Sequence, residues 1–109
     1  MINFDKWCND LKKYWLQKDI TSILELFDSQ VEYYETPFQK IDNIKEVWED
    51  IETQELTSLE YRIIGIKENT AIANFIMDDN GEVIDMIYEI KLNDLGKCDY
   101  FKQWYMCSN

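Results

Sequence analysis

The chain has 109 residues, of which 46% are apolar and 15% aromatic, which fits one folded domain with a hydrophobic core and excludes wholesale disorder. Its 22 acidic residues outnumber 11 basic ones, so the formal net charge is −11 and no nucleic-acid partner is expected. Histidine is absent, which excludes His-ligated metal sites and histidine-based nucleophile pairs. Arg62 is the single arginine, so bidentate binding of a phosphate by arginines is nearly excluded as well.

The first half of the chain has helical periodicity. Apolar residues recur at helical spacing over residues 4–15, directly after Asn3, which suits an N-cap. A second helix is expected after Asp19, with an apolar stripe over residues 20–27. Residues 31–34 then predict a short strand, which ends before the proline that follows.

A third helix is expected over residues 44–51, with Asn43 and Glu46 in the spacing of a capping box. The second half of the chain changes to strand character between turn signals such as Asn80-Gly81. Four strands are expected there, over residues 59–66, 70–77, 82–92 and 97–106. Helices followed by an antiparallel meander indicate an α+β fold, and residues 1–109 are expected to form a single domain.

Strand parity predicts which side chains face the helices, because successive side chains of a strand point to opposite sides. In the strand over residues 82–92, one side is apolar and is expected to meet the helices: Ile84, Met86, Tyr88, Ile90 and Leu92. The other side, which includes Asp85, is mixed and suits either solvent or a second copy of the chain.

The last strand is expected to turn Phe101, Gln103 and Tyr105 toward the helices, because Lys102 belongs outside. Trp104 would then lie on the outer face of the sheet. A large aromatic side chain in that place indicates a surface for a partner.

Three features of the sequence indicate the cellular compartment: the cysteines, the N-terminus and the absence of long apolar runs. Cys8, Cys98 and Cys107 are widely spaced and form no C-x-x-C pair, which predicts free thiols in a reducing compartment. No signal-peptide pattern is present, and no segment approaches the roughly 18 apolar residues of a membrane helix. We therefore expect a cytoplasmic protein with no membrane partner.

Residues 31–38 contain a valine, a tyrosine and a Pro-Phe pair at the spacing V-x-Y-x-x-x-P-F. The helix that carries Trp15, the stretch 24–28, the helix over 44–48 and the closing segment 96–105 add further aromatic and turn signals. Together these segments resemble the NTF2-like superfamily, in particular its SnoaL-like branch, over nearly the whole chain. The resemblance implies a cone in which three N-terminal helices pack in a strongly curved, mostly antiparallel sheet. It also implies an apolar pocket at the open end and a homodimer formed through the sheet.

The resemblance transfers known catalytic residues poorly. Ketosteroid-isomerase-like members use an aspartate directly before the loop proline, where this chain has Thr36, and Glu35 is expected to point to the other face. Dehydratase-like members use histidines, and epoxide-hydrolase-like members need an Asp-Arg-Asp set that is not visible around Arg62. Cyclase-like members use an acidic residue deep in the pocket, for which Asp85 is the candidate.

The catalytic candidates are therefore Glu35 and Asp85, each of which could instead be a solvated surface carboxylate. The candidate binding residues are aromatic or amide side chains that could also be ordinary core or backbone partners: Trp15, Tyr33, Tyr34, Trp48, Asn74, Tyr88 and Gln103. The acidic stretches match no calcium loop, so neither a metal nor another cofactor is expected.

Three functions stay open at this point. The first is a domain that binds a small hydrophobic molecule in an apolar pocket. The second is an isomerase, dehydratase or cyclase that uses Glu35 or Asp85 with a tyrosine donor, which requires a buried carboxylate and a tyrosine hydroxyl in one cavity. The third is a protein-interaction module that acts through the outer sheet face around Trp104, as the superfamily's nuclear-transport members bind partners, and it predicts a filled cone.

Overall fold

The computed structural model describes residues 2–108 and begins with the helix that the periodicity predicts. Helix α1 spans Phe4–Leu16, and the Asn3 side chain accepts a hydrogen bond from the backbone N–H of Lys6. Its buried stripe consists of Phe4, Trp7, Cys8, Leu11 and Trp15. The predicted N-cap and apolar face of this helix are both confirmed.

The other two helices are shorter. Helix α2 spans Ile20–Glu25, and its cap is the predicted Asp19, but it ends before Phe27, which instead begins the first strand. Helix α3 spans Ile44–Glu49 and continues into a 3-10 turn over Asp50–Thr53. The expected capping box at α3 is wrong, because the Asn43 side chain makes no capping hydrogen bond.

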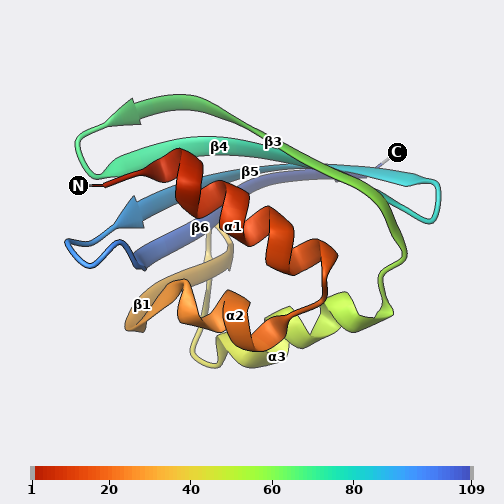
Figure 1. Ribbon diagram of the computed structural model, residues 1–109, viewed down its shortest axis with the longest axis horizontal. Coiled ribbons are helices and arrows are strands. Elements are labelled where there is room, and N and C mark those ends of the chain that lie inside the picture. The colour runs from red at the N-terminus through yellow and green to blue at the C-terminus, as the bar shows by residue number, and fades with distance from the viewer. Residues whose placement is uncertain (1, 109) are drawn as a thin grey trace.

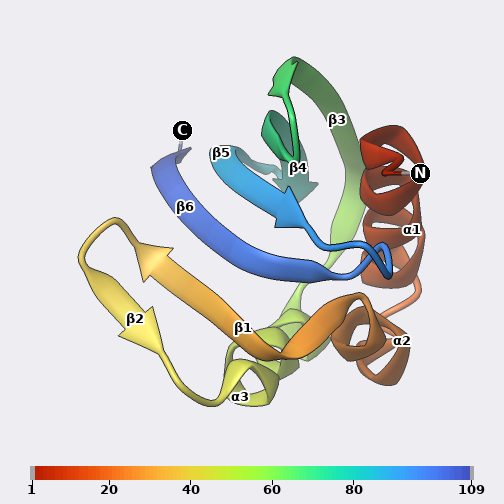
Figure 2. The same ribbon diagram turned by 90° about the vertical axis from the view of Figure 1, so that its left-hand side faces the viewer.

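Six strands form one mixed, strongly curved sheet around these helices (Figures 1 and 2). The strands are β1 (Phe27–Thr36), β2 (Gln39–Ile41), β3 (Leu56–Lys67), β4 (Thr70–Asp79), β5 (Glu82–Leu92) and β6 (Cys98–Ser108). Their order across the sheet is β2-β1-β6-β5-β4-β3, and every neighbouring pair is antiparallel except β1 and β6, which are parallel. The α+β class is confirmed, although α3 follows β1 and β2 and does not precede the sheet.

The first strand differs most from its prediction. β1 begins four residues earlier than residue 31, because the backbone N–H of Cys98 bonds to the Leu26 carbonyl and Phe27 pairs with Cys98. β2 was not predicted, since its three residues contain no alternation of apolar and polar side chains that is long enough to recognise. The early start of β1 depends on pairing with a strand that is distant in the sequence, and β2 is too short to be recognised from its own residues.

The inner face of the sheet, defined here as the face packed against the helices, is aromatic. Tyr88 and Phe101 lie with their ring centroids 4.6 Å apart, and Phe101 stacks on Tyr33 at 5.0 Å. Trp7 of α1 meets Phe27 edge to face at 5.6 Å. Phe101, Tyr88 and the other predicted inward residues Met86, Ile90 and Leu92 are buried, and Ile84 is half-buried against the same core. The parity prediction for β5 is therefore confirmed.

The parity prediction for β6 fails at one residue. Tyr88 pairs with Gln103, but Ile87 pairs with Tyr105, so Trp104 is an extra residue that forms a β-bulge. The bulge moves Tyr105 to the outer face beside Ile87, where it is 47% exposed, so the prediction that Tyr105 faces the helices is wrong. Trp104 is exposed, as predicted.

Within residues 2–108, none of the helices has the length and apolar character that a membrane crossing requires.

Candidate functional site

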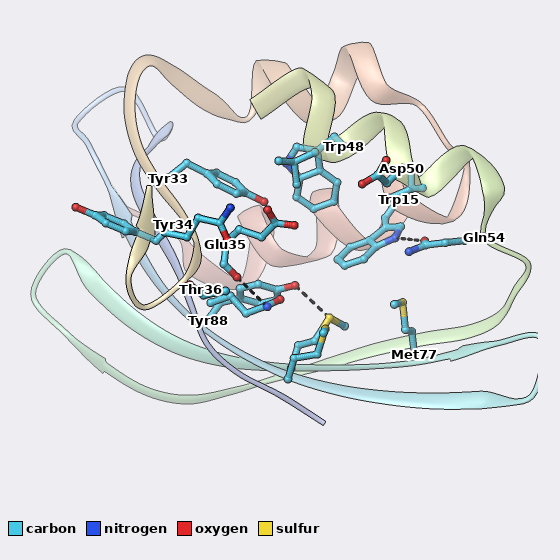
Figure 3. Close-up of a pocket in the computed structure, with 16 residues that line it drawn as sticks. Trp15, Tyr33, Tyr34, Glu35, Thr36, Trp48, Asp50, Gln54, Met77 and Tyr88 are labelled. Carbon is cyan, nitrogen blue, oxygen red and sulfur yellow. Dashed lines mark hydrogen bonds between the residues drawn. The ribbon is translucent and has the colours of Figure 1, made fainter. Parts of the chain in front are cut away.

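A cavity of about 360 Å³ lies between the inner face of the sheet and the helices α1 and α3 (Figure 3). Its apolar wall is built from aromatic, methionine and aliphatic side chains: Trp15, Tyr33, Trp48, Tyr88, Met77, Met86, Met106, Val47 and Ile51. Its polar lining consists of Glu35, Thr36, Gln39, Asp50, Gln54 and Gln103, and Tyr34 completes the border. The cavity therefore combines an apolar wall with a small number of polar groups.

Two tryptophans from different helices form one side of the cavity. The rings of Trp15 in α1 and Trp48 in α3 meet edge to face, with centroids 5.0 Å apart. Trp15 donates its indole N–H to Oε1 of Gln54 at 2.9 Å (Figure 3). The Nε1 of Trp48 is buried and has no hydrogen-bond partner among the described residues. This nitrogen is enclosed by its packing, so it is a buried donor that the described side chains leave unsatisfied.

Glu35 points into the cavity from β1 (Figure 3). Strand alternation gives Glu35 the same side as Tyr33, and Tyr33 is buried on the inner face, so the expectation that Glu35 faces away is wrong. The register of β1 against β2 also shifts between Tyr34 and Thr36, which leaves Glu35 without a partner on β2.

Two buried tyrosine hydroxyls share the cavity with this carboxylate. Burial raises the pKa of Tyr33, and the nearby Tyr88 and the negative charge of Glu35 raise it further. Burial, followed by the charge of Glu35, also raises the pKa of Tyr88, whose hydroxyl donates to the sulfur of Met86 at 3.1 Å. Both hydroxyls therefore keep their protons at neutral pH and can act as hydrogen-bond donors toward a ligand.

Gln103 of β6 is hydrogen-bonded to the backbone of Glu35. Its side-chain Nε2 donates to the backbone carbonyl of Glu35 at 3.0 Å, which joins β6 to the bulged segment of β1. The amide thus satisfies a backbone group, which is one of its two predicted roles, and it also lines the cavity.

The Tyr34 ring points away from the cavity (Figure 3). Nζ of Lys102 lies 4.5 Å from its centroid, and the ring of Tyr100 lies 5.8 Å away. Its hydroxyl donates to Glu32 at 3.4 Å. Tyr34 therefore borders the cavity without turning its ring into it.

Asn74 and Asp85 lie on the opposite, outer face of the sheet. Nδ2 of Asn74 donates to Oδ1 of Asp85 at 2.5 Å and to the Met86 carbonyl at 2.9 Å. Its Oδ1 accepts a hydrogen bond from Nε of Arg62 at 3.2 Å. The three side chains connect β3, β4 and β5, and Asn74 is buried among them. The structure does not bring Asn74 or Asp85 together with the cavity residues.

Several lining residues were not predicted as site residues. Met86 shares the predicted inward parity of Tyr88, so parity could have included it, and Met106 enters the cavity because the bulge at Trp104 shifts the alternation. Asp50 lies within the predicted helix but was expected on its solvated acidic face, and Gln54 follows the 3-10 turn, beyond the last residue of the predicted helix.

Within residues 2–108 the structure shows no metal cluster, and two of the three thiols are buried. No group of three or more acidic or cysteine side chains there could hold a metal ion. Burial raises the pKa of Cys8 to about 12, with a smaller contribution from the Asp5 charge, and burial also raises the pKa of Cys98. These two cysteines are inert core residues.

Comparison with solved structures identifies the architecture. No protein-family model and no curated protein matches the sequence. An NTF2-like protein of unknown function from Burkholderia xenovorans LB400 superposes with a TM-score of 0.76 at 17% identity, over 94% of this chain and 80% of that chain. The chain has the NTF2-like fold.

Two enzymes share the NTF2-like fold at similar coverage. The epoxide hydrolase/cyclase-like enzyme SalBIII matches with a TM-score of 0.71 at 13% identity, over 95% of this chain and 93% of that chain. A Δ5-3-ketosteroid isomerase from Mycobacterium sp. matches with a TM-score of 0.67 at 10% identity, over 95% and 96%. At such identities the likeness concerns the fold, and chemistry has to be argued from this chain's own residues.

Proposed function

We propose that this NTF2-like chain binds a small hydrophobic molecule in the cavity of its cone. The observation that carries the proposal is the cavity itself, about 360 Å³ in volume, with tryptophan, tyrosine and methionine walls and a few polar groups. Small-molecule sites in proteins are typically concave, mostly apolar and of this size, with a few polar groups that orient the ligand.

A matched pair of tryptophan substitutions tests the proposal. Met106→Trp narrows the cavity, whereas Leu95→Trp places a tryptophan at an exposed position in the turn before β6, outside the cavity. Calorimetry with 2-naphthylmethanol as the probe should show binding by the wild type and by Leu95→Trp, and at least about tenfold weaker binding by Met106→Trp. Failure of the wild type to bind any of a set of apolar alcohols, ketones and amines would contradict the proposal.

A second candidate function is proton transfer at a carbon next to a carbonyl group. It is favoured by one observation, the presence of Glu35 and the hydroxyls of Tyr33 and Tyr88 in one cavity. Glu35 would remove the proton from the carbon and return it at a second position, while a tyrosine donates a hydrogen bond to the enolate oxygen. Asp85, on the outer face, has no part in this proposal.

Deuterium exchange separates this enzyme from a binding domain. A hydrophobic cyclic ketone in D₂O should exchange its α-protons faster with the wild type than with Glu35→Gln, as followed by NMR. Equal exchange with both proteins would contradict the enzyme and leave the binding proposal in place, because binding does not require a base.

We also propose that two copies associate through the outer face of β4–β6. Ile76, Val83, Trp104 and Tyr105 expose apolar surface there. A cytoplasmic location and the absence of a nucleic-acid partner remain predictions from composition.

A further inference from the structure

The charged groups around the cavity are of one sign. Glu35 and Asp50 line it, and no lysine or arginine does. The ion pairs of the described residues join Lys6 to Asp10 and Lys12 to Glu60, so neither cavity carboxylate has a cationic partner there.

The surface beside the cavity continues this charge. A shallow depression shares Glu35 and Asp50 with the cavity and adds Asp42 and Glu46, against Lys40 as the basic residue of its lining. With a net charge of −11 on the whole chain, the field at this opening attracts cations and repels anions.

The cavity walls favour a cation as well. Trp15, Trp48, Tyr33 and Tyr88 contribute aromatic rings to the lining, and ring faces attract ammonium groups, most strongly where water is excluded. The chain already uses this interaction on its outer face, where Nζ of Lys102 lies 4.7 Å from the centroid of Trp104.

We propose that the ligand of the cavity is a cationic amphiphile, namely a protonated amine attached to an aromatic or aliphatic body. The proposal rests on the proposed binding function and names the ligand class. The ammonium group pairs with the Glu35 carboxylate, with Asp50 also in the lining, and the apolar body packs against the Trp15–Trp48 pair. Carboxylates and phosphates of the same size are disfavoured by the same charges.

Three probes with one body and different charges test the inference: 2-naphthylmethylamine, 2-naphthylmethanol and 2-naphthoate. Calorimetry at low salt should show the amine binding about tenfold more tightly than the alcohol and the carboxylate more weakly than either. Salt at about 0.5 M should narrow the difference between amine and alcohol, because it screens charges near the surface.

Neutral variants locate the source of the preference. Glu35→Gln should weaken binding of the amine toward that of the alcohol while leaving the alcohol's affinity within about twofold, and Asp50→Asn should act in the same direction more weakly. Glu49→Gln, at an exposed position of α3 outside both linings, is the matched control and should change nothing. Thermal denaturation of each variant checks that it is folded.

The outcomes separate the preference for a positively charged ligand from the binding function itself. Equal affinity for amine and alcohol, tighter binding of the carboxylate, or a preference for the amine that survives both neutral variants would overturn the charge inference and leave the binding function standing. If none of the three probes binds the wild type, the proposed function fails, and the inference fails with it.

Discussion

The side-chain amide of Gln103 donates a hydrogen bond to the backbone carbonyl of Glu35 at 3.0 Å. Gln103 belongs to β6 and Glu35 to the bulged part of β1, so the bond fixes the cavity carboxylate from the neighbouring parallel strand. The position of the charge in the cavity therefore depends on a residue that need not touch the ligand.

Gln103→Met tests this relationship. The substitution keeps the size of the side chain and removes the donor, so we expect the free energy of unfolding to fall by about 1 kcal/mol. Gln30→Met, at an exposed position of β1, should change it by less than about 0.5 kcal/mol. Urea denaturation measures both values, and equal effects of the two substitutions would show that the bond to Glu35 is not formed in solution.

The two cavity tryptophans should respond differently to loss of their N–H groups. Trp48→Ala should cost about 3–5 kcal/mol, because the ring is buried against Trp15. Trp48→Phe should cost less than Trp15→Phe by about 1 kcal/mol, since only Trp15 loses a hydrogen bond, the one to Gln54. Denaturant unfolding with tyrosine fluorescence as the signal measures these differences. A cost below about 1 kcal/mol for Trp48→Ala would mean that α3 does not pack on the cavity as described.

Stability should fall in alkaline solution because of the buried tyrosines. The folded-state pKa values of Tyr33 and Tyr88 lie above the usual value of about 10, so the neutral hydroxyl is favoured in the folded chain. Their contribution is fully present below about pH 10 and is lost as the pH rises toward the folded-state pKa.

The double variant Tyr33→Phe and Tyr88→Phe isolates this effect from that of the cysteines. Above about pH 10, its free energy of unfolding should decline less steeply than that of the wild type. Tyr100→Phe, on the outer face, serves as the control for removing a tyrosine hydroxyl outside the cavity. Parallel curves for wild type and double variant would contradict the burial of these hydroxyls.

The outer sheet face provides the prediction about assembly. Trp104→Asp places a charge on the exposed apolar surface and should convert a dimer to a monomer in light scattering after gel filtration. Leu95→Asp, which changes an equally apolar and more exposed residue in the turn before β6, should leave the dimer intact. A wild-type protein that stays monomeric at high concentration would contradict the proposed association through the outer face.

The parts of the structure that could be predicted are those encoded within a few residues. The stripe of α1 and the alternation of β5 follow from helical and strand periodicity, and both are confirmed. Periodicity predicts the wrong face for Tyr105, because a bulge is decided by how β6 pairs with β5 and nothing in residues 97–106 marks Trp104 as the extra residue. The expectation for Glu35 is wrong because it follows from the proline after Thr36, whereas the parity of Tyr33 indicates the inner face.

The same distinction holds for the candidate site, where residues of regular elements could be predicted and residues held by contacts across strands could not. Aromatic residues that the sequence offered as pocket residues, such as Trp15 and Tyr88, do line the cavity, because they belong to regular elements whose inward faces are predictable. Asn74 is buried as an inward residue would be, but its burial comes from Arg62 and Asp85 on the outer face, a network across three strands that no local pattern reveals. A buried polar residue in a strand therefore has hydrogen-bond partners, but its burial does not show on which face of the sheet it lies.

The parallel pairing of β1 with β6 has a consequence for biosynthesis. The strand that carries Glu35 can acquire this neighbour only after residues near 103 have left the ribosome, which is more than sixty residues after Glu35 itself emerges. Until then the hairpin of β1 and β2 is an isolated two-stranded piece, too small to be stable in water. A nascent chain stalled before β6 should therefore bind no ligand and should present Tyr33 and Phe27 to chaperones, so the cavity is among the last parts of the molecule to form.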